Sequence, residues 1–334
     1  MQCTLHIPHL IPPRELGESL WRTVDAPQLK TLLARADFSR SAESGADAGL
    51  CSAFGIARQQ DWPLAPLLAR SENLTTESGY WLCATPVHLE TRRNALILTD
   101  PASLNITAAD SAAFAATLAD HLREENITLH APQPARWFLR CDASPVMTTS
   151  SLEAVTGRDV RLSLPQGPDS PRWRRILTEI QMLLHAHPAN DARETSGHAP
   201  VNSVWLWGGG TLPTPAPAAY DAVWSDDLMV RALTYHSACR SEPCPARIAV
   251  DALQAGSHFF SFEPLAALMR QGDLQAWSNA VSALNRAWFN PLMQALKSRR
   301  LRTLNIISAN QAGTRQFIIH PSDQIKFWRK NKYL

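Results

Sequence analysis

The clearest pattern of apolar and polar positions lies in the middle of the chain. Apolar residues recur at three- and four-residue spacing over residues 173–184, which predicts one buried stripe on an amphipathic helix. Pro188 is expected to end that helix, and a polar loop is expected to follow it. Residues 203–207 form a short apolar run that leads into three glycines, which indicates a buried strand whose end needs backbone freedom or close packing.

The same patterns predict the elements on either side. Near the start, residues 4–7 read as a strand and residues 27–35 as a helix. Short strands at 80–83, 87–89, 95–98, 127–129 and 137–139, with a helix at 108–124, are typical of an α+β module. In the last part of the chain, four elements follow one another: an element at 246–253, a strand at 258–262, a long helix at 274–298 and a strand at 303–307. This alternation favours a mainly parallel sheet.

Together these elements predict an α/β protein whose large sheet is built from both ends of the chain. The main domain is expected to comprise residues 1–78 and 214–334, and an inserted α+β module residues 79–213. The proline-rich residues 213–217 are expected to be a stiff connector at the join.

Composition narrows the class of protein. The chain has 334 residues, of which 45% are hydrophobic and 19% are charged, enough for a substantial core. A net charge of +2 with mixed signs gives no broad basic face, so nucleic acid is not an expected partner. No apolar run approaches the roughly 20 residues of a membrane span, and the first residues lack a cationic leader. Six scattered cysteines without an export signal indicate reduced thiols in the cytoplasm.

Several motifs resemble the archaeal-type cofactor-independent phosphoglycerate mutases. The central segment carries that family's His-Pro-x-Asn-x-x-Arg run from His187 to Arg193, and its Asn-x-x-Trp-x-Trp-Gly-x-Gly strand from Asn202. Over nearly the whole chain the sequence also resembles the bacterial RpfE-type regulatory protein group, with landmarks at residues 61–63, 79–82, 86–89 and 179–184. These resemblances imply an alkaline-phosphatase-like fold.

The mutase resemblance also implies two divalent metals, such as Mn or Zn, and a serine nucleophile, which need about six to seven Asp and His ligands. Three of the family's ligand clusters have no counterpart here. No carboxylate directly follows the first strand at residues 7–11, only Glu263 stands within 260–267, and residues 306–310 supply neither Asp nor His. The sequence therefore predicts a degenerate alkaline-phosphatase-like sheet with no metal site.

The remaining polar positions suggest an anion site in the module. Arg193 and the backbone amides of the glycine triplet are groups that suit a phosphate or a carboxylate. The candidate ligand-binding residues are Arg136, His187, Asn190, Arg193, Asn202, Gly208, Gly209 and Gly210. The alternative is purely structural: Asn190 in a turn, Arg193 paired with Glu194 or Glu179, and glycines that permit a tight strand end.

The function that the sequence favours is a cytoplasmic, metal-independent pseudoenzyme or regulatory protein. It would bind a small phosphorylated or carboxylated metabolite, or a protein partner, and not a membrane. One alternative is an active phosphoglycerate mutase-like phosphotransferase with two divalent metals, for which the spare ligands are Asp226, Asp227, His236, Asp251, His258 and Asp273. Another is a structural interaction protein, since some of the 11 tryptophans lie in polar contexts.

Overall fold

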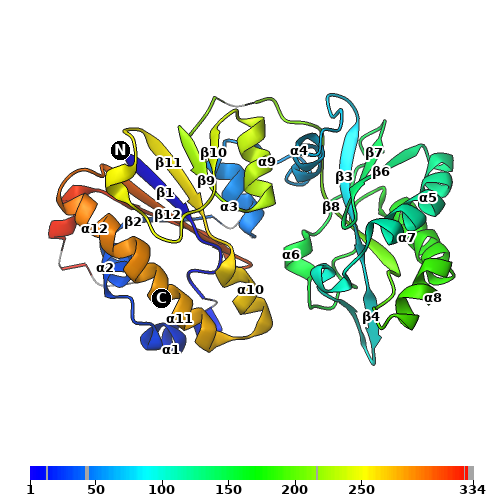
Figure 1. Ribbon diagram of the computed structural model, residues 1–334, viewed down its shortest axis with the longest axis horizontal. Coiled ribbons are helices and arrows are strands. Elements are labelled where there is room, and N and C mark those ends of the chain that lie inside the picture. The colour runs from blue at the N-terminus through cyan, green and yellow to red at the C-terminus, as the bar shows by residue number, and fades with distance from the viewer. Residues whose placement is uncertain (13, 42–44, 216, 327, 330–334) are drawn as a thin grey trace. The chain divides into compact units, whose positions relative to one another are not determined.

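The computed structural model describes residues 1–12, 14–41, 45–215, 217–326 and 328–329. The chain divides into two units, which are shown in Figure 1. Unit 1 comprises Met1–Ile56 and Pro215–Leu334, and unit 2 comprises Ala57–Thr214. Both ends of the chain therefore build one unit, and a continuous central segment builds the other.

Unit 1 is built on a mixed sheet. Within the described residues it has seven strands in the order β10-β9-β11-β1-β12-β13-β2. The first five run parallel to their neighbours, while β13 and β2 are antiparallel additions at one edge. The strands are β1 (Gln2–His6), β2 (Asp37–Ser41), β9 (Ala222–Trp224), β10 (Arg240–Glu242), β11 (Ser257–Ser261), β12 (Thr303–Asn310) and β13 (Gly313–Ile319). The prediction of a large, mainly parallel sheet in an α/β fold is confirmed.

Helices supply the apolar side chains that cover this sheet. The helices of unit 1 are α1 (Arg14–Thr23), α2 (Pro27–Arg35), α3 (Ala46–Ala53), α9 (Leu228–His236), α10 (Pro264–Gln271), α11 (Leu274–Leu284) and α12 (Asn290–Lys297). One core joins residues of β1, β11 and β12 to α2, α11 and α12. Trp288 lies in this core, with its ring edge-on to Phe260 and Phe262 at centroid distances of 5.0 and 4.5 Å. Such aromatic pairs add to the stability that burial provides.

The long helix predicted at 274–298 is interrupted. A π-helical turn, Asn285–Phe289, separates α11 from α12. Pro291 explains the interruption, because proline has no N–H to donate to the carbonyl four residues earlier. That carbonyl, on Ala287, instead accepts a hydrogen bond from the Ile248 N–H at 3.3 Å. The segment containing Ile248 had been predicted as one of the alternating elements at 246–253, but only a short 3₁₀ turn, Val250–Ala252, forms there.

Unit 2 is an α+β module, and the structure describes all of its residues. A four-stranded antiparallel sheet has the order β6-β7-β3-β8, and β4 and β5 form a separate hairpin. The strands are β3 (Tyr80–Val87), β4 (Leu89–Arg92), β5 (Ala95–Leu98), β6 (Ile127–Gln133), β7 (Arg136–Cys141) and β8 (Ser203–Gly210). The helices are α4 (Leu64–Ser71), α5 (Ala108–Glu124), α6 (Leu152–Val155), α7 (Ser170–His185) and α8 (Pro188–Thr195). Apolar residues of α5 and α7 share a core with β3, β7 and β8.

The first boundary between the units lies earlier in the chain than residue 79, where the sequence pattern placed it. Residues 57–78 pack with the module, because α4 lies against β3 and β8. The side chain of Leu64 lies beside Gly208, and Gln59 exchanges two hydrogen bonds of 2.9 Å with the backbone of Thr211. The second boundary, at Thr214/Pro215, falls within the proline-rich connector, of which residue 216 lies outside the described residues.

Pro188 begins a helix instead of leading into a loop. The helix predicted from residue 173 ends at His185, and α8 starts at Pro188, where the missing N–H of proline costs no hydrogen bond. His187 caps α8, because its Nδ1 accepts a hydrogen bond from the Ala189 N–H at 3.2 Å.

The first turn of α5 provides a test of local stability. The Thr107 Oγ1 accepts a hydrogen bond from the Asp110 N–H, and the Asp110 carboxylate accepts one from the Thr107 N–H, both at 3.1 Å. We expect Thr107→Ala to lower the free energy of unfolding by about 1 kcal/mol in chemical denaturation, because it removes this capping box. Thr178→Ala on the exposed face of α7 is the control, since its hydroxyl only bonds back to the Arg174 carbonyl. Equal stability of the two variants would contradict the cap.

Within the described residues, no helix combines the length and apolar character that membrane crossing requires.

Candidate functional site

A cavity of about 590 Å³ lies in unit 1, beside the ends of two parallel strands. β9 leads through Ser225 and Asp226 into α9, and β11 leads through Phe262 into α10. Because β9 and β11 pair in parallel, their carboxyl ends meet at one edge of the sheet. Ligands of α/β sheets bind at this edge. We call this cavity the unit 1 pocket.

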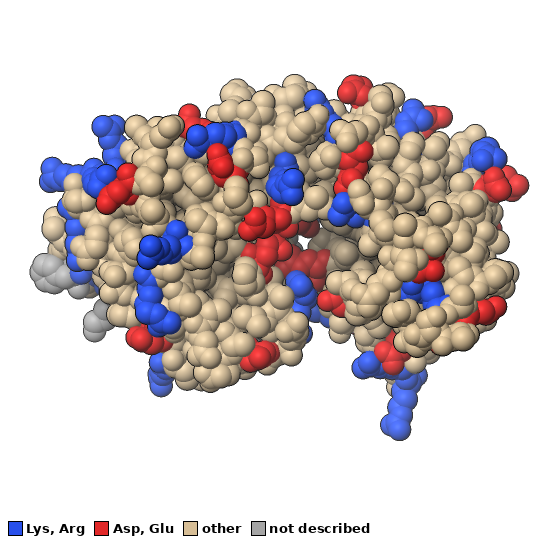
Figure 2. Space-filling view, in the orientation of Figure 1, with Lys and Arg blue, Asp and Glu red and all other residues tan. Residues whose placement is uncertain are grey.

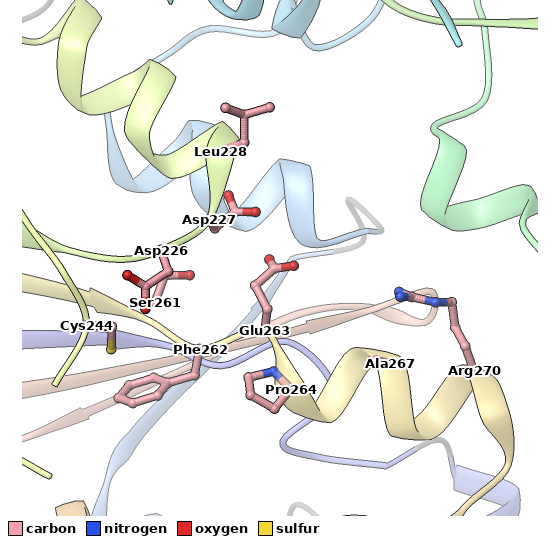
Figure 3. A pocket seen from close by; sticks show the side chains of 10 residues that line it. All are labelled: Asp226, Asp227, Leu228, Cys244, Ser261, Phe262, Glu263, Pro264, Ala267 and Arg270. Atoms are coloured by element: carbon pink, nitrogen blue, oxygen red, sulfur yellow. The ribbon is translucent and has the colours of Figure 1, made fainter. Parts of the chain in front are cut away.

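Acidic side chains dominate the chemistry of the unit 1 pocket. Asp226, Asp227 and Glu263 contribute three carboxylates, whereas Arg270 is the cation among the described lining residues. Figure 3 shows the side chains of Asp227 and Glu263 turned toward the same space, with Arg270 on the same side of α10 as Glu263. Figure 2 shows acidic side chains gathered on this face of unit 1, near the starts of α9 and α10. A negatively charged ligand would meet electrostatic repulsion here.

The remaining lining residues are apolar or weakly polar. Leu228, Phe262, Pro264 and Ala267 supply apolar surface, and Ser261 supplies a hydroxyl. The unit 1 pocket therefore combines a strongly charged part with an apolar part.

Ser261 is paired with a histidine on the adjacent strand. The Ser261 Oγ lies 3.1 Å from the Nδ1 of His6, and both side chains are buried. The parallel register of β1 and β11 places these residues opposite each other at the carboxyl ends of both strands. The imidazole lies nearly parallel to the Phe259 ring, with centroids 6.2 Å apart and an interplanar angle of 18°.

Burial changes the ionisation of two groups in the pocket. It raises the pKa of Asp227, although the backbone N–H groups of Val230, Met229 and Leu228 act in the opposite direction. Burial, with a contribution from the charge of Asp226, raises the pKa of the Cys244 thiol to about 12. Cys244 therefore stays protonated at neutral pH and is a poor nucleophile. All six cysteines lie in the described residues, and each is free of disulfide bonds.

The six spare metal ligands from the sequence do not converge. Asp226 and Asp227 lie in the unit 1 pocket, but His236 lies in the last turn of α9, at the other end of that helix. His258 is near the amino end of β11, where its Nε2 lies 3.0 Å from the Gln254 carbonyl. Asp251 is paired with Arg300, and Asp273 caps α11 through the Ala276 N–H.

The residues at this edge do not fit a two-metal centre. Among the residues that the structure describes, no group of three or more His, Cys, Asp or Glu side chains is placed to hold a metal ion. Two metals need several such ligands converging on one point. Some polar side chains at the edge instead bond to the protein itself. The Asp227 carboxylate accepts from the Val230 N–H at 2.8 Å, and the Asn310 side chain donates to the Ile11 carbonyl at 3.0 Å.

Arg193, the cation of the anion site predicted in the module, is buried and bound by the protein. It is 3% exposed, and its guanidinium pairs with the Asp110 carboxylate at 2.8 Å. It also donates to the carbonyls of Leu104 and Ala199. Neither suggested partner pairs with it here: Glu179 pairs with Arg175 and His121. This position leaves the guanidinium no exposed face for a ligand.

The amide side chains predicted for the same site also serve the fold. The Asn190 side chain donates to the Leu184 and Val201 carbonyls and accepts from the Val201 N–H, at 2.7 to 2.9 Å. Asn202 bonds to both the N–H and the carbonyl of Leu89. The bonds to Val201 and Leu89 therefore pair backbone groups next to β8 and β4 that would otherwise lack hydrogen-bond partners.

The other predicted site residues have structural contacts too. The Nε2 of His187 lies 3.0 Å from the Thr117 hydroxyl, and Arg136 forms an ion pair with Glu72 at 2.6 Å. Gly208 has a φ of 67°, in the region that favours glycine. Added Cβ atoms at Gly209 and Gly210 would collide with Tyr80 and Pro63, respectively. The triplet therefore allows close packing inside the module.

Sequence reasoning missed the Ser261–His6 pair. His6 and Ser261 are 255 positions apart, and only the parallel pairing of β1 with β11 brings them together. Asp226 and Asp227 were named only as spare ligands, because the strand before them, β9, has three residues and gives no clear pattern. The available signal for Ser261 was its position directly after Phe259 and Phe260.

Comparison with known proteins finds short sequence matches to mutases and gives limited information on function. No protein-family model matches the chain. A stretch of 70 residues is 33% identical to a probable 2,3-bisphosphoglycerate-independent phosphoglycerate mutase of Geobacter sulfurreducens, covering 21% of this chain and 18% of that protein. A stretch of 59 residues is 34% identical to the corresponding mutase of Methanosarcina mazei, covering 18% of this chain and 15% of that protein. The chain thus matches less than a fifth of the length of either mutase.

Two solved structures align with nearly the whole chain at low sequence identity. The PH0037 protein of Pyrococcus horikoshii superposes with a TM-score of 0.59 and 12% identity, over 96% of this chain and 87% of that one. The cofactor-independent phosphoglycerate mutase of Thermoplasma acidophilum gives a TM-score of 0.49 and 13% identity, over 96% of this chain and 90% of that one. The similarity to the PH0037 protein supports an α/β fold, in which the large sheet of this chain is mostly parallel.

Proposed function

We propose that this chain is a metal-independent protein on a phosphoglycerate mutase-like scaffold, which binds a small molecule in the unit 1 pocket in an accessory or regulatory role. The observation that carries the proposal is the side-chain set at the carboxyl edge of the parallel sheet. Three carboxylates there form no metal-binding group with other described residues, while Asp227 serves as a helix cap. The regulatory part rests on the resemblance to the RpfE-type group.

The pocket changes the class of ligand that we propose. The sequence favoured a phosphorylated or carboxylated metabolite at Arg193, but that guanidinium is buried and bonded within the module. In the unit 1 pocket, Asp226, Asp227 and Glu263 oppose a ligand with several negative charges. An uncharged or cationic small molecule is the better match.

The second candidate is an active mutase-like phosphotransferase. The specific observation in its favour is the 32–35% identity that stretches of 59 to 70 residues share with six curated mutases. This candidate requires that the spare ligand residues, which now lie apart, converge to bind two divalent metals.

Metal content and turnover separate the two candidates. We expect purified protein to carry manganese and zinc well below one equivalent, and to leave 3-phosphoglycerate unchanged when manganese is added, since the ligand set does not converge. Elemental analysis and a coupled mutase assay measure these quantities, with a known cofactor-independent mutase as the positive control. About two equivalents of bound metal with turnover would overturn the proposal.

A further inference from the structure

Ser261, which lines the unit 1 pocket, lies within hydrogen-bond distance of the His6 imidazole behind it. The Nδ1 of His6 lies 3.1 Å from the Oγ of Ser261. A general base must lie within about 2.6–3.2 Å of the group whose proton it accepts. Serine activated by an adjacent imidazole is a recurrent nucleophile on unrelated folds.

The surroundings fix the imidazole in this orientation. One face of the His6 ring stacks on Phe259, at a centroid distance of 6.2 Å. On α3, a Cβ added to Gly49 would lie 3.4 Å from the His6 Nε2 and 3.3 Å from the Ile307 side chain. Glycine at position 49 therefore lets α3 pack closely on the ring. A base that is held in place loses little entropy when it acts.

We infer that Ser261 is a nucleophile activated by His6, and that it takes an acyl group from an uncharged or cationic carboxylic ester bound in the unit 1 pocket. The acidic lining selects the substrate class, because Asp226, Asp227 and Glu263 would repel a phosphate ester. The apolar surface of Leu228 and Phe262 suits the acyl or alcohol part of an ester. This inference rests on the proposed use of the pocket for small molecules, and it requires no metal.

The reaction balances with water as the second substrate. The Ser261 Oγ bonds to the ester carbonyl carbon while its proton passes to the His6 Nδ1. The ester C–O bond then breaks, and the alcohol leaves with that proton. Water attacks the acyl-serine in the same way, which releases the carboxylic acid and restores the hydroxyl and the neutral imidazole.

The test uses 4-nitrophenyl acetate, an uncharged ester, with the full chain. We expect release of nitrophenolate and, after acid quenching, one acetyl group on Ser261, located by fragmentation of its peptide in the mass spectrometer. Ser261→Ala should abolish this acetylation. His6→Gln should slow it by about 10²- to 10⁴-fold, the usual contribution of a general base. Ser257→Ala is the matched control, because Ser257 lies at the other end of the same strand and bonds to Asp221.

Each outcome decides the inference. Acetyl groups on lysine or other residues without one on Ser261, or acetylation of Ser261 that His6→Gln does not slow, would overturn it. If a variant fails to fold by circular dichroism, the peptide map of the parent protein still decides, since it needs no substitution. The metal and mutase measurements judge the proposed function separately. Two bound metals with turnover would overturn that function whether or not Ser261 is acetylated.

Discussion

Replacing Arg193 with alanine is expected to lower the free energy of unfolding by about 1–3 kcal/mol, the usual cost of leaving buried acceptors without their donor. The change removes the partner of the Asp110 carboxylate and the donors to the Leu104 and Ala199 carbonyls. These acceptors would lose protein hydrogen bonds in a largely buried place, which is costly. Chemical denaturation followed by tryptophan fluorescence measures the loss.

Two comparisons test that explanation. Arg161→Ala removes an exposed ion pair with Asp159, so we expect the denaturation midpoint to stay near that of the parent protein. Arg193→Lys keeps the charge but lacks the planar fork that reaches three acceptors, so it should rescue little of the lost stability. Equal midpoints for Arg193→Ala and Arg161→Ala would contradict the buried role.

The same interaction has a pH dependence with a definite sign. Although partial burial opposes it, hydrogen bonds from Thr107 and Arg193 hold the pKa of Asp110 below its ordinary value. A lowered folded-state pKa stabilises the protein above the ordinary aspartate value of about 4, and this stabilisation is lost as the pH falls through the folded value. The difference between the parent protein and Arg193→Ala should therefore shrink below about pH 4.

Gly210→Ala is expected to destabilise the protein by about 1–3 kcal/mol through overpacking. A Cβ at this position would lie 2.5 Å from the Pro63 Cβ, 2.9 Å from the Pro63 Cα and 2.9 Å from the Gln59 side chain. Relief would require backbone movement between β8 and the segment before α4, because the Cα of Pro63 belongs to the main chain. Thermal and chemical denaturation both measure the effect.

Gly17→Ala is the control for this substitution. Gly17 lies inside α1, and a Cβ there has nothing within 4 Å among the described residues. Alanine favours a helix over glycine by about 0.5–1 kcal/mol, so this variant should be as stable as the parent protein or more so. A neutral Gly210→Ala would show that β8 and the residues before α4 are less tightly packed than the structure indicates.

Local sequence patterns predicted the elements that carry their own signals. The helices at 27–35 and 108–124 have the predicted bounds in α2 and α5, because their apolar spacing and their start signals agree. The strand at Ala95–Leu98 was also correct. The short strands β9 and β10, of three residues each, had no such pattern and were missed.

Pro188 was predicted to end one helix, but not to begin the next. Pro188 does mark the end of the preceding helix, yet it also begins α8, since the first helical position needs no N–H. Pro291 was overlooked inside the predicted long helix. The Ala287 carbonyl that it leaves without a helical donor accepts a hydrogen bond from Ile248, a residue distant in the sequence.

Whether the polar motif in the module binds a ligand depends on its hydrogen-bond partners, some of which come from distant parts of the sequence. His187, Asn190 and Arg193 form a polar motif in the sequence, but side chains from α5 and carbonyls of the module use their hydrogen-bonding groups. The motif therefore looked like a ligand site until its partners were known. Ser261 gave no motif at all, because its partner is near the start of the chain.

Local patterns in the sequence were enough to predict the α/β class and a sheet built from both chain ends, because apolar periodicity is a local property. Tertiary structure alone decided the strand order, the burial of Arg193 and the meeting of Ser261 with His6. The physical reason is that hydrogen-bond partners and burial depend on which distant segments pack together. Parallel pairing joins residues that no short-range pattern connects.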